Sequence, residues 1–124
     1  MNKFWKKKLG FQGFTLIELL IIISIIGILS AIAISHFSAA KRQAWNAASK
    51  SALKNAYDAA QAFYAESPGG ALTPATLQNY GYSPEAYVNL TVLDGSMLGL
   101  SMTASYNQPG AQTYTINSIG SISP

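Results

Sequence analysis

Residues 13–34 read GFTLIELLIIISIIGILSAIAI, and Glu18 is the only charged side chain among them. The apolar run begins at Phe14 and ends at Ile34. A helix rises about 1.5 Å per residue, so this run would extend roughly 30 Å, the thickness of the hydrocarbon core of a bilayer. The stretch therefore predicts a membrane-spanning helix that carries an acid near its start.

The helical pattern continues beyond the apolar run. Residues 35–66 contain neither glycine nor proline and are rich in alanine. Apolar side chains recur there at helical spacing, in one series of Leu53, Ala56, Ala60 and Phe63 and in another of Trp45, Ala52 and Ala59. Residues 67–70, Ser-Pro-Gly-Gly, end the pattern. We expect one helix over residues 14–65, whose amphipathic second half, residues 35–66, presents an apolar stripe to a small domain.

Residues 67–124 predict a loop followed by a small sheet. Thr73 and Pro74 are typical of an N-cap and a first helical residue, and Gly81 is typical of a helix stop. Apolar and polar side chains then alternate over residues 88–92 and 98–106, with a turn at residues 94–96 between them.

A second turn at residues 107–110 leads to a third strand around Tyr114 and Ile116. The expected fold class is α+β. In this fold a long N-terminal α-helix, transmembrane in its first half, packs on a three- or four-stranded antiparallel meander.

The positive charge of the chain is concentrated before the apolar run. Half of its eight basic residues precede Phe14, namely Lys3, Lys6, Lys7 and Lys8. No other basic residue occurs before Lys41, so the charge asymmetry predicts a single-pass protein with a cytoplasmic N-terminus and an exported remainder. Residues 14–124 contain four basic residues and five acids. They therefore have no net positive charge that would favour binding of nucleic acid.

Residues 13–18 (GFTLIE), continued by residues 19–20 and 26–29, resemble the processing motif of type IV pilins and pseudopilins. In that family prepilin peptidase, a membrane-embedded aspartic peptidase, cuts after the glycine and methylates the new amino terminus. The resemblance implies a leader of residues 1–13, cleavage between Gly13 and Phe14, and N-methylation of Phe14. A conventional secretory signal is cut after its apolar stretch, whereas this junction precedes it, so cleavage leaves the anchor attached.

Glu18 occupies a costly position, because an ionised carboxylate in a membrane requires a partner. In the family that the chain resembles, the corresponding acid pairs with the free amino terminus of a neighbouring subunit. The resemblance therefore implies that Glu18 and Phe14 direct assembly of copies of this chain into a helical filament. Removal of either charge would leave the other uncompensated in a dry bundle. The alternative is that Glu18 caps amides at the helix start or reaches the membrane interface.

The implied function is that of a structural pilus subunit and not of an enzyme. The precursor would reside in the inner membrane, with prepilin peptidase and an inner-membrane assembly platform as partners, and the assembled subunit would be extracellular. No nucleophile with an adjacent base, phosphate-binding glycine loop or suitably spaced acid pair is evident in the sequence. We expect no cofactor, no metal and no direct nucleic-acid partner.

Two alternatives remain open. A pseudopilin of a type II secretion or DNA-uptake system would use the same N-terminal segment. A secreted binding protein would instead have a conventional signal peptide that ends at Ala31-Ile32-Ala33.

The sequence departs from the family pattern in two respects. Ser35 occupies a position where pilins often have proline, so the helix retains that amide donor and should be straighter, with Gly27 as a weak point. The chain also has no cysteine, so it lacks the C-terminal disulfide of many pilins.

Other side chains favour structural interpretations over functional ones. His36, the single histidine, is expected at the membrane interface. Trp45, Tyr57, Phe63 and Tyr64 favour core or subunit contacts over an electron-transfer path, and the basic residues Lys41, Arg42, Lys50 and Lys54 favour a solvated helix face. Asn89-Leu90-Thr91 matches a glycosylation sequon within an expected strand, which we give little weight.

Overall fold

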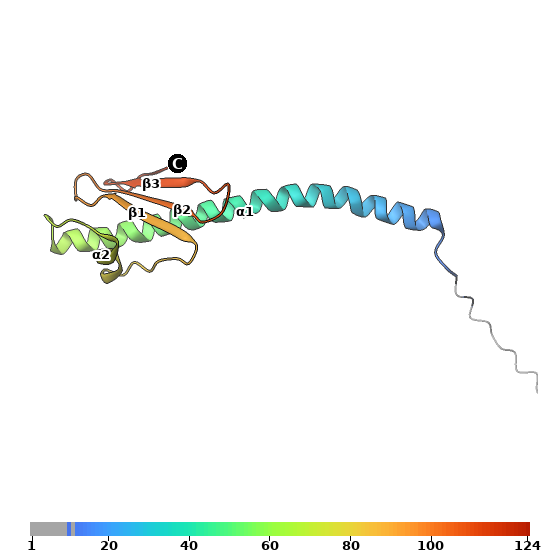
Figure 1. The fold of residues 1–124 in the computed structure, drawn as a ribbon, viewed down its shortest axis with the longest axis horizontal. Coiled ribbons are helices and arrows are strands. Elements are labelled where there is room, and N and C mark those ends of the chain that lie inside the picture. Colours follow the sequence, from blue (N-terminus) through green and yellow to red (C-terminus); the bar gives the residue numbers. More distant parts are fainter. Residues whose placement is uncertain (1–9, 11) are drawn as a thin grey trace, which may run out of the picture. The chain divides into compact units, whose positions relative to one another are not determined.

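The computed structural model describes Gly10 and residues 12–124, so the lysines of the expected leader lie outside the described residues. The elements are α1 (Leu16–Glu66), α2 (Pro74–Asn79), β1 (Val88–Asp94), β2 (Ser101–Tyr106), β3 (Thr113–Asn117) and β4 (Ile122–Ser123) (Figure 1). The chain divides into two compact units, an N-terminal unit, Met1–Phe37, and a C-terminal unit, Ser38–Pro124. The predicted α+β class, with a long N-terminal helix and a small antiparallel sheet, is confirmed.

Helix α1 is continuous from Leu16 to Glu66 and passes through Gly27 and Ser35 without a break. Because position 35 is not proline, its backbone amide is retained, and its hydroxyl donates to the Ala31 carbonyl over 3.4 Å. At the C-terminal end the Ser67 amide donates to the Phe63 carbonyl at 2.8 Å, and the chain then turns away. The helix thus begins slightly after the expected position and ends where the Ser-Pro-Gly-Gly segment predicts.

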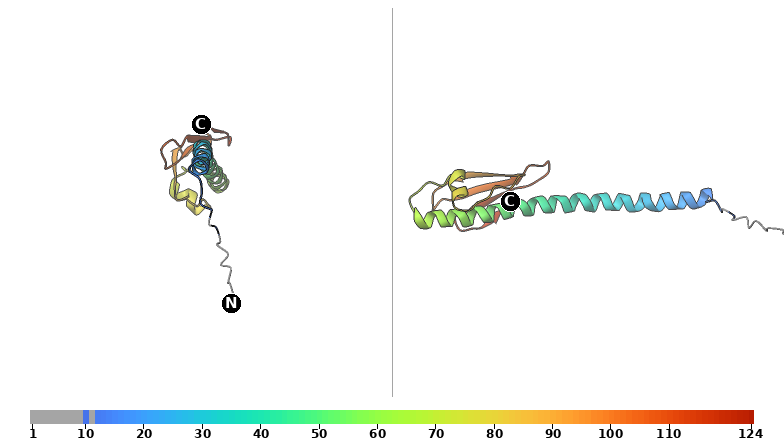
Figure 2. Two further views of the ribbon diagram at one scale, coloured as in Figure 1. Left: turned by 90° about the vertical axis from the view of Figure 1, so that its right-hand side faces the viewer. Right: turned by 90° about the horizontal axis from the view of Figure 1, so that it is seen from below.

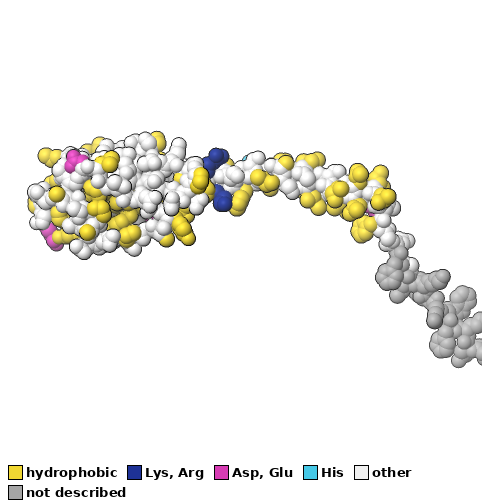
Figure 3. Space-filling view, in the orientation of Figure 1, with side chains coloured by type: hydrophobic (Ala, Val, Ile, Leu, Met, Phe, Trp, Pro, Cys, Tyr) yellow, Lys and Arg dark blue, Asp and Glu magenta, His cyan; other side chains and the backbone are white. Residues whose placement is uncertain are grey.

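In the N-terminal unit the apolar side chains of α1 are exposed. Phe14 is 81 % exposed, Leu16 is 89 % exposed and Ile34 is 67 % exposed. Figure 3 shows hydrophobic side chains distributed along this part of the helix. Within the described residues, α1 is the one helix long and apolar enough to cross a membrane. An apolar surface of this extent requires cover by lipid or by other helices.

In the C-terminal unit the strands form a four-stranded antiparallel meander in the order β1-β2-β3-β4. The fourth strand is the short segment Ile122–Ser123, which pairs with β3. Figures 1 and 2 show the sheet lying along α1 within this unit, with α2 beside the β1 edge. One side of the sheet can therefore be buried against the helix.

The core of this unit lies between α1 and the sheet. The predicted helix stripe is confirmed, since Leu53, Ala56 and Ala60 are fully buried and Phe63 is nearly so. The sheet contributes alternate residues, and the loops around α2 contribute a third set. These groups are Val88, Leu100, Met102, Ala104, Tyr114 and Ile116 from the sheet segment, and Leu72, Leu77 and Tyr82 from the α2 region. Alanines on the helix leave room for larger sheet side chains such as Met102 and Ile116.

The expected start of the second strand at residue 98 was wrong, because β2 begins at Ser101 and Leu98 is 91 % exposed. A longer turn precedes the strand. The Asp94 carboxylate accepts hydrogen bonds from the Ser96 amide at 2.8 Å and the Ser96 hydroxyl at 2.7 Å, and the Gly99 amide donates to that hydroxyl at 3.2 Å. The bonds from Ser96 hold the pKa of Asp94 below its ordinary value. These side-chain hydrogen bonds thus extend the turn into residues whose alternating apolar and polar side chains had predicted a strand.

Gly95 in this turn joins three parts of the unit. Its carbonyl oxygen accepts the Leu72 amide and the Tyr64 hydroxyl, each at 2.8 Å. A Cβ at Gly95 would overlap the Leu72 backbone, which explains why glycine occupies the position. The contact fixes the turn between β1 and β2 against α1 and the segment before α2.

The short helix α2 agrees with its sequence signals. Thr73 is the N-cap and forms a capping box with Thr76, while Pro74 occupies the first turn. Gly81 adopts a φ of 97°, in the left-handed region that favours glycine, just after the helix ends.

We predict that Leu53→Ala destabilises the C-terminal unit by about 2–5 kcal/mol, because it leaves a cavity at a fully buried site. The measurement is urea unfolding followed by the fluorescence of Trp45, which stacks on Tyr106 in this unit. Leu98→Ala is the matched control and should change stability by less than about 0.5 kcal/mol, since that side chain is exposed. Equal losses in the two variants would contradict the described core.

Candidate functional site

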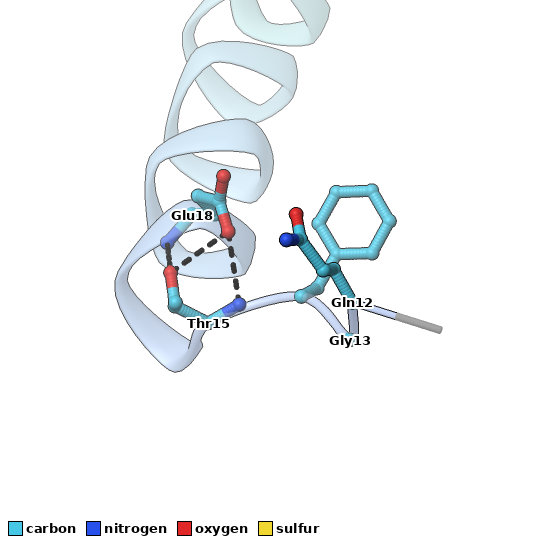
Figure 4. Close-up of a pocket in the computed structure, with 5 residues that line it drawn as sticks. Gln12, Gly13, Thr15 and Glu18 are labelled. Carbon is cyan, nitrogen blue, oxygen red and sulfur yellow. Dashed lines mark hydrogen bonds between the residues drawn. The ribbon is translucent and has the colours of Figure 1, made fainter. Parts of the chain in front are cut away.

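Thr15 and Glu18 form a reciprocal capping box at the start of α1 (Figure 4). The Glu18 amide donates to the Thr15 hydroxyl at 3.2 Å, and the Thr15 amide donates to Glu18 Oε2 at 2.9 Å. The Thr15 hydroxyl also donates to the same carboxylate oxygen at 2.9 Å. The spacing Thr-x-x-Glu permits this exchange, because the N-cap and the third helical residue face each other across the first turn. The carboxylate thus satisfies an amide that has no acceptor inside the helix.

The two carboxylate oxygens of Glu18 have different surroundings. Oε2 accepts both bonds from Thr15, whereas Oε1 accepts none from the described part of the chain. The side chain is exposed, and Figure 4 shows Oε1 turned away from Thr15. The capping role considered from the sequence is therefore present in this uncleaved chain, and it leaves one oxygen available for a second partner.

The expected cleavage junction lies directly before this cap. Gly13 and Phe14 are exposed and have no helical backbone, and together with Gln12, Thr15 and Glu18 they line an open hollow of about 600 Å³. A Cβ placed on Gly13 would meet no atom within 4 Å. The peptide bond between Gly13 and Phe14 is thus accessible with respect to the described residues, and packing against those residues does not require glycine at position 13.

The structure separates the aromatic residues singled out from the sequence. Phe63 and Tyr64 lie in the core with ring centroids 5.3 Å apart, as their spacing predicts. Trp45 instead stacks on Tyr106 of β2, with centroids 5.8 Å apart and an interplanar angle of 13°. The half-buried Tyr57 donates from its hydroxyl to the Ser118 carbonyl at 3.2 Å. The four aromatic residues thus serve packing at three places, with Phe63 and Tyr64 together and Trp45 and Tyr57 elsewhere.

Two contacts of basic residues were not predicted. The Lys41 ammonium lies 5.9 Å from the Trp45 ring centroid, and the Lys50 ammonium lies 4.7 Å from that of Tyr114. The Lys41–Trp45 contact joins residues four apart on α1, a spacing that is visible in the sequence. The Lys50–Tyr114 contact instead depends on the pairing of α1 with a distant strand, which no local sequence pattern reveals.

Other candidate groups remain separate from the helix start. His36 is exposed, and the described residues contain no group of three His, Cys, Asp or Glu side chains that could hold a metal ion. Asn89 and Thr91 are exposed on β1, which is paired with β2. The candidate site is accordingly the segment from Gly13 to Glu18.

We predict that Thr15→Val frays the first turn of α1, because it removes the hydroxyl that accepts the Glu18 amide. Loss of an N-cap costs about 1 kcal/mol, so exchange of that amide proton with solvent should accelerate about fivefold. Hydrogen exchange of the full chain in detergent micelles measures this rate. Thr15→Ser retains the hydroxyl and should exchange like the unchanged chain; equal rates in the two variants would argue against the cap.

Comparison with known proteins gives matches that include this segment. The family model for the prokaryotic N-terminal methylation motif matches residues 8–34. The chain is 46 % identical over 55 residues to the type IV major pilin protein PilA of Myxococcus xanthus, covering 44 % of this chain and 25 % of that protein. It is 41 % identical over 88 residues to a fimbrial protein of Pseudomonas aeruginosa, covering 68 % of this chain and 54 % of that protein.

The chain spans between a quarter and about half of the length of these relatives. The matched motif covers the capped helix start and the exposed apolar part of α1, and the long helix with its small antiparallel sheet is pilin-like. The motif and these relatives support a place for the chain in the type IV pilin family.

Proposed function

We propose that the chain is a structural subunit of a type IV pilus. It is inserted in the inner membrane as a precursor with its N-terminus in the cytoplasm, and prepilin peptidase cuts it between Gly13 and Phe14 and methylates Phe14. An inner-membrane assembly platform then adds the subunit to an extracellular filament of copies of the same chain. The role is mechanical and not enzymatic.

The observation that carries the proposal is the carboxylate of Glu18 at the start of an exposed apolar helix. One of its oxygens is bound by Thr15, and the other has no partner in the described chain. Cleavage after Gly13 keeps the Thr15 amide and creates an ammonium on Phe14, one residue before the cap. Capping and assembly therefore do not compete, since Oε2 serves Thr15 while Oε1 accepts the ammonium of a neighbouring copy.

Electrostatics makes this pairing depend on processing. The leader holds Lys3, Lys6, Lys7 and Lys8, and its removal takes away the charges that oppose withdrawal of the helix from the membrane. The same cut supplies the positive charge that Glu18 requires in a dry helix bundle. An uncleaved chain is consequently retained in the membrane without the partner for assembly.

The exposed surface of α1 supports helix-to-helix packing in the filament. Ser30, Ala31 and Ala33, with Gly27, are small residues that allow neighbouring helix backbones to approach closely. The large side chains between them, such as Ile28 and Leu29, are more than half exposed in the single chain. Packing of copies in the filament would cover that surface after the helix has been withdrawn from the membrane.

The N-terminal mass of the mature protein tests processing. We expect a chain that begins with N-methylated Phe14, measured by mass spectrometry of protein from sheared filaments. Gly13→Val should prevent the cut and leave the leader attached, because it replaces the glycine before the expected junction. A Cβ there meets no atom of the described residues within 4 Å, so the fold should be unchanged. A mature chain that begins at Ile34 or Ser35 would instead show conventional secretion.

Substitution of Glu18 tests assembly and separates its two roles. Glu18→Gln retains an amide oxygen for the capping box but loses the charge, whereas Glu18→Val loses both. We expect both variants to insert in the membrane and to reduce filament yield by about 100-fold or more, since an unpaired buried ammonium costs several kcal/mol. Immunoblots of sheared filaments and of membranes measure the two pools.

The outcomes have distinct meanings. Normal filaments from Glu18→Gln together with few from Glu18→Val would show that capping, not charge pairing, is the role of this residue. Secretion defects without surface filaments of the unchanged protein would assign the chain to a pseudopilin system instead.

A further inference from the structure

In the sequence of the C-terminal unit, the basic residues and the acidic residues form two separate groups. Its four basic residues all precede its four acids in sequence, the two groups being Lys41, Arg42, Lys50 and Lys54, and Asp58, Glu66, Glu85 and Asp94. On the face drawn in Figure 3, Lys and Arg side chains gather at one end of this unit and acidic side chains lie at the other. The side-chain charges of the unit sum to zero, and the basic residues and the acids are grouped separately along its sequence.

Helix stability does not account for this order. The last turn of α1 contains Glu66 and no basic residue, although the C-terminal end of a helix favours cations. Arg42, Lys50 and Lys54 make no ion pair with any acid of the described chain. Arg42 is thus left for a contact outside the single chain, whereas the Lys50 ammonium lies over the Tyr114 ring.

The unit contains a pocket of about 240 Å³ lined by Ser38, Lys41, Arg42, Trp45, Pro109 and Gly110. Its aromatic wall is fixed, because Trp45 stacks on Tyr106. The base of the neighbouring loop is also fixed, since Asn46 accepts the Gln112 amide at 3.3 Å and donates to the Gln112 side chain at 3.4 Å. An exposed guanidinium on a helix therefore borders a preformed hollow that suits a carboxylate.

The acids differ in how much of their hydrogen-bonding capacity is already used. Glu66 accepts the Tyr80 hydroxyl at 2.6 Å, and Asp94 accepts two bonds from Ser96. Asp58 and Glu85 are exposed and accept no hydrogen bond from the described chain. Asp58 is the better-positioned of the two, because it lies on α1, whereas Glu85 lies on an irregular segment.

The surroundings of Asp58 complement those of Arg42. Asp58 borders an open hollow of about 360 Å³ with Asn55, Ala59, Tyr80, Gly81 and Ser83, none of which is charged. A guanidinium entering this hollow would meet a single carboxylate together with polar groups that can accept further hydrogen bonds, such as the Asn55 side chain and the Ser83 hydroxyl.

We propose that the Arg42 pocket of one copy binds Asp58 of a neighbouring copy in the filament. The contact joins two different patches of the same chain and is therefore heterologous, and such contacts generate open helical assemblies when they do not close into a ring. A copy of the chain fits better than a nucleic acid, because each copy brings both patches and the unit has no net charge to attract a polyanion. The proposal rests on the filament function and names a contact outside the apolar helix bundle.

A charge swap tests the contact in the full-length chain. Arg42→Glu and Asp58→Arg should each lower the yield of sheared filaments about tenfold or more, since each places like charges opposite one another. The double variant Arg42→Glu, Asp58→Arg should restore the yield, because the pair is rebuilt with its signs exchanged. Both positions are exposed, so circular dichroism should show unchanged folding in all three variants.

A matched control separates a specific pair from general charge effects. Glu85→Arg makes the same change of charge as Asp58→Arg at the other unoccupied acid, and it should retain normal yield. Rescue of Arg42→Glu by Glu85→Arg, or no rescue by Asp58→Arg, would overturn the assignment.

The absence of cysteine provides a direct second measurement. When a chain with Arg42→Cys and a chain with Asp58→Cys are expressed together, a short bismaleimide reagent should link them into a dimer in filaments. The control pair Arg42→Cys and Glu85→Cys, one in each chain, should remain unlinked, and the reverse result would refute the contact.

Two further outcomes separate this contact from the filament function. Normal filaments from Arg42→Glu would refute the contact and leave the filament function intact. If that variant also retained less of a short DNA duplex on sheared filaments, the pocket would be a phosphate site and not a contact between copies. Failure of the unchanged protein to form filaments would count against both proposals.

Discussion

An ionised carboxylate in an apolar environment requires hydrogen-bond donors or a counter-charge, and this constraint organises the start of α1. The chain meets half of the requirement locally, because Thr15 donates its amide and its hydroxyl to one oxygen of Glu18. The other carboxylate oxygen, Oε1, remains available to form an ion pair with an external cation. Local capping is therefore compatible with the intermolecular pairing proposed for the same side chain, and the Thr-x-x-Glu spacing accounts for the cap.

The two units differ in what stabilises them. The C-terminal unit buries its own core between α1 and the sheet, so its stability can be measured and altered one residue at a time. The described apolar side chains of the N-terminal unit are exposed, and its helix depends on lipid or on other helices for burial. A substitution among the exposed apolar residues of the first unit should thus alter its contacts with lipid or with other helices, and one in the buried core of the second should change folding.

Much of this could be predicted from the sequence, where local chemistry decided the outcome. The stripe of Leu53, Ala56 and Ala60 followed from helical periodicity, and the end of α1 followed from the Ser-Pro-Gly-Gly segment. Leu98 was misassigned, because hydrogen bonds around Asp94 and Ser96 prolong a turn that apolar alternation conceals. The stacking of Trp45 on Tyr106 and the pocket beside Arg42 depend on long-range packing, which no local pattern encodes.

The connectivity of the sheet has a consequence for how the chain acquires its structure. Each strand pairs with its neighbour in sequence, so the meander can form by successive hairpins with small losses of chain entropy. The absence of cysteine means that no oxidation or disulfide exchange delays this process. The slower event should be docking of the completed sheet on α1, where the Gly95 carbonyl joins Tyr64 to Leu72. Folding speed would then be governed by docking of the sheet on α1 and not by formation of a disulfide.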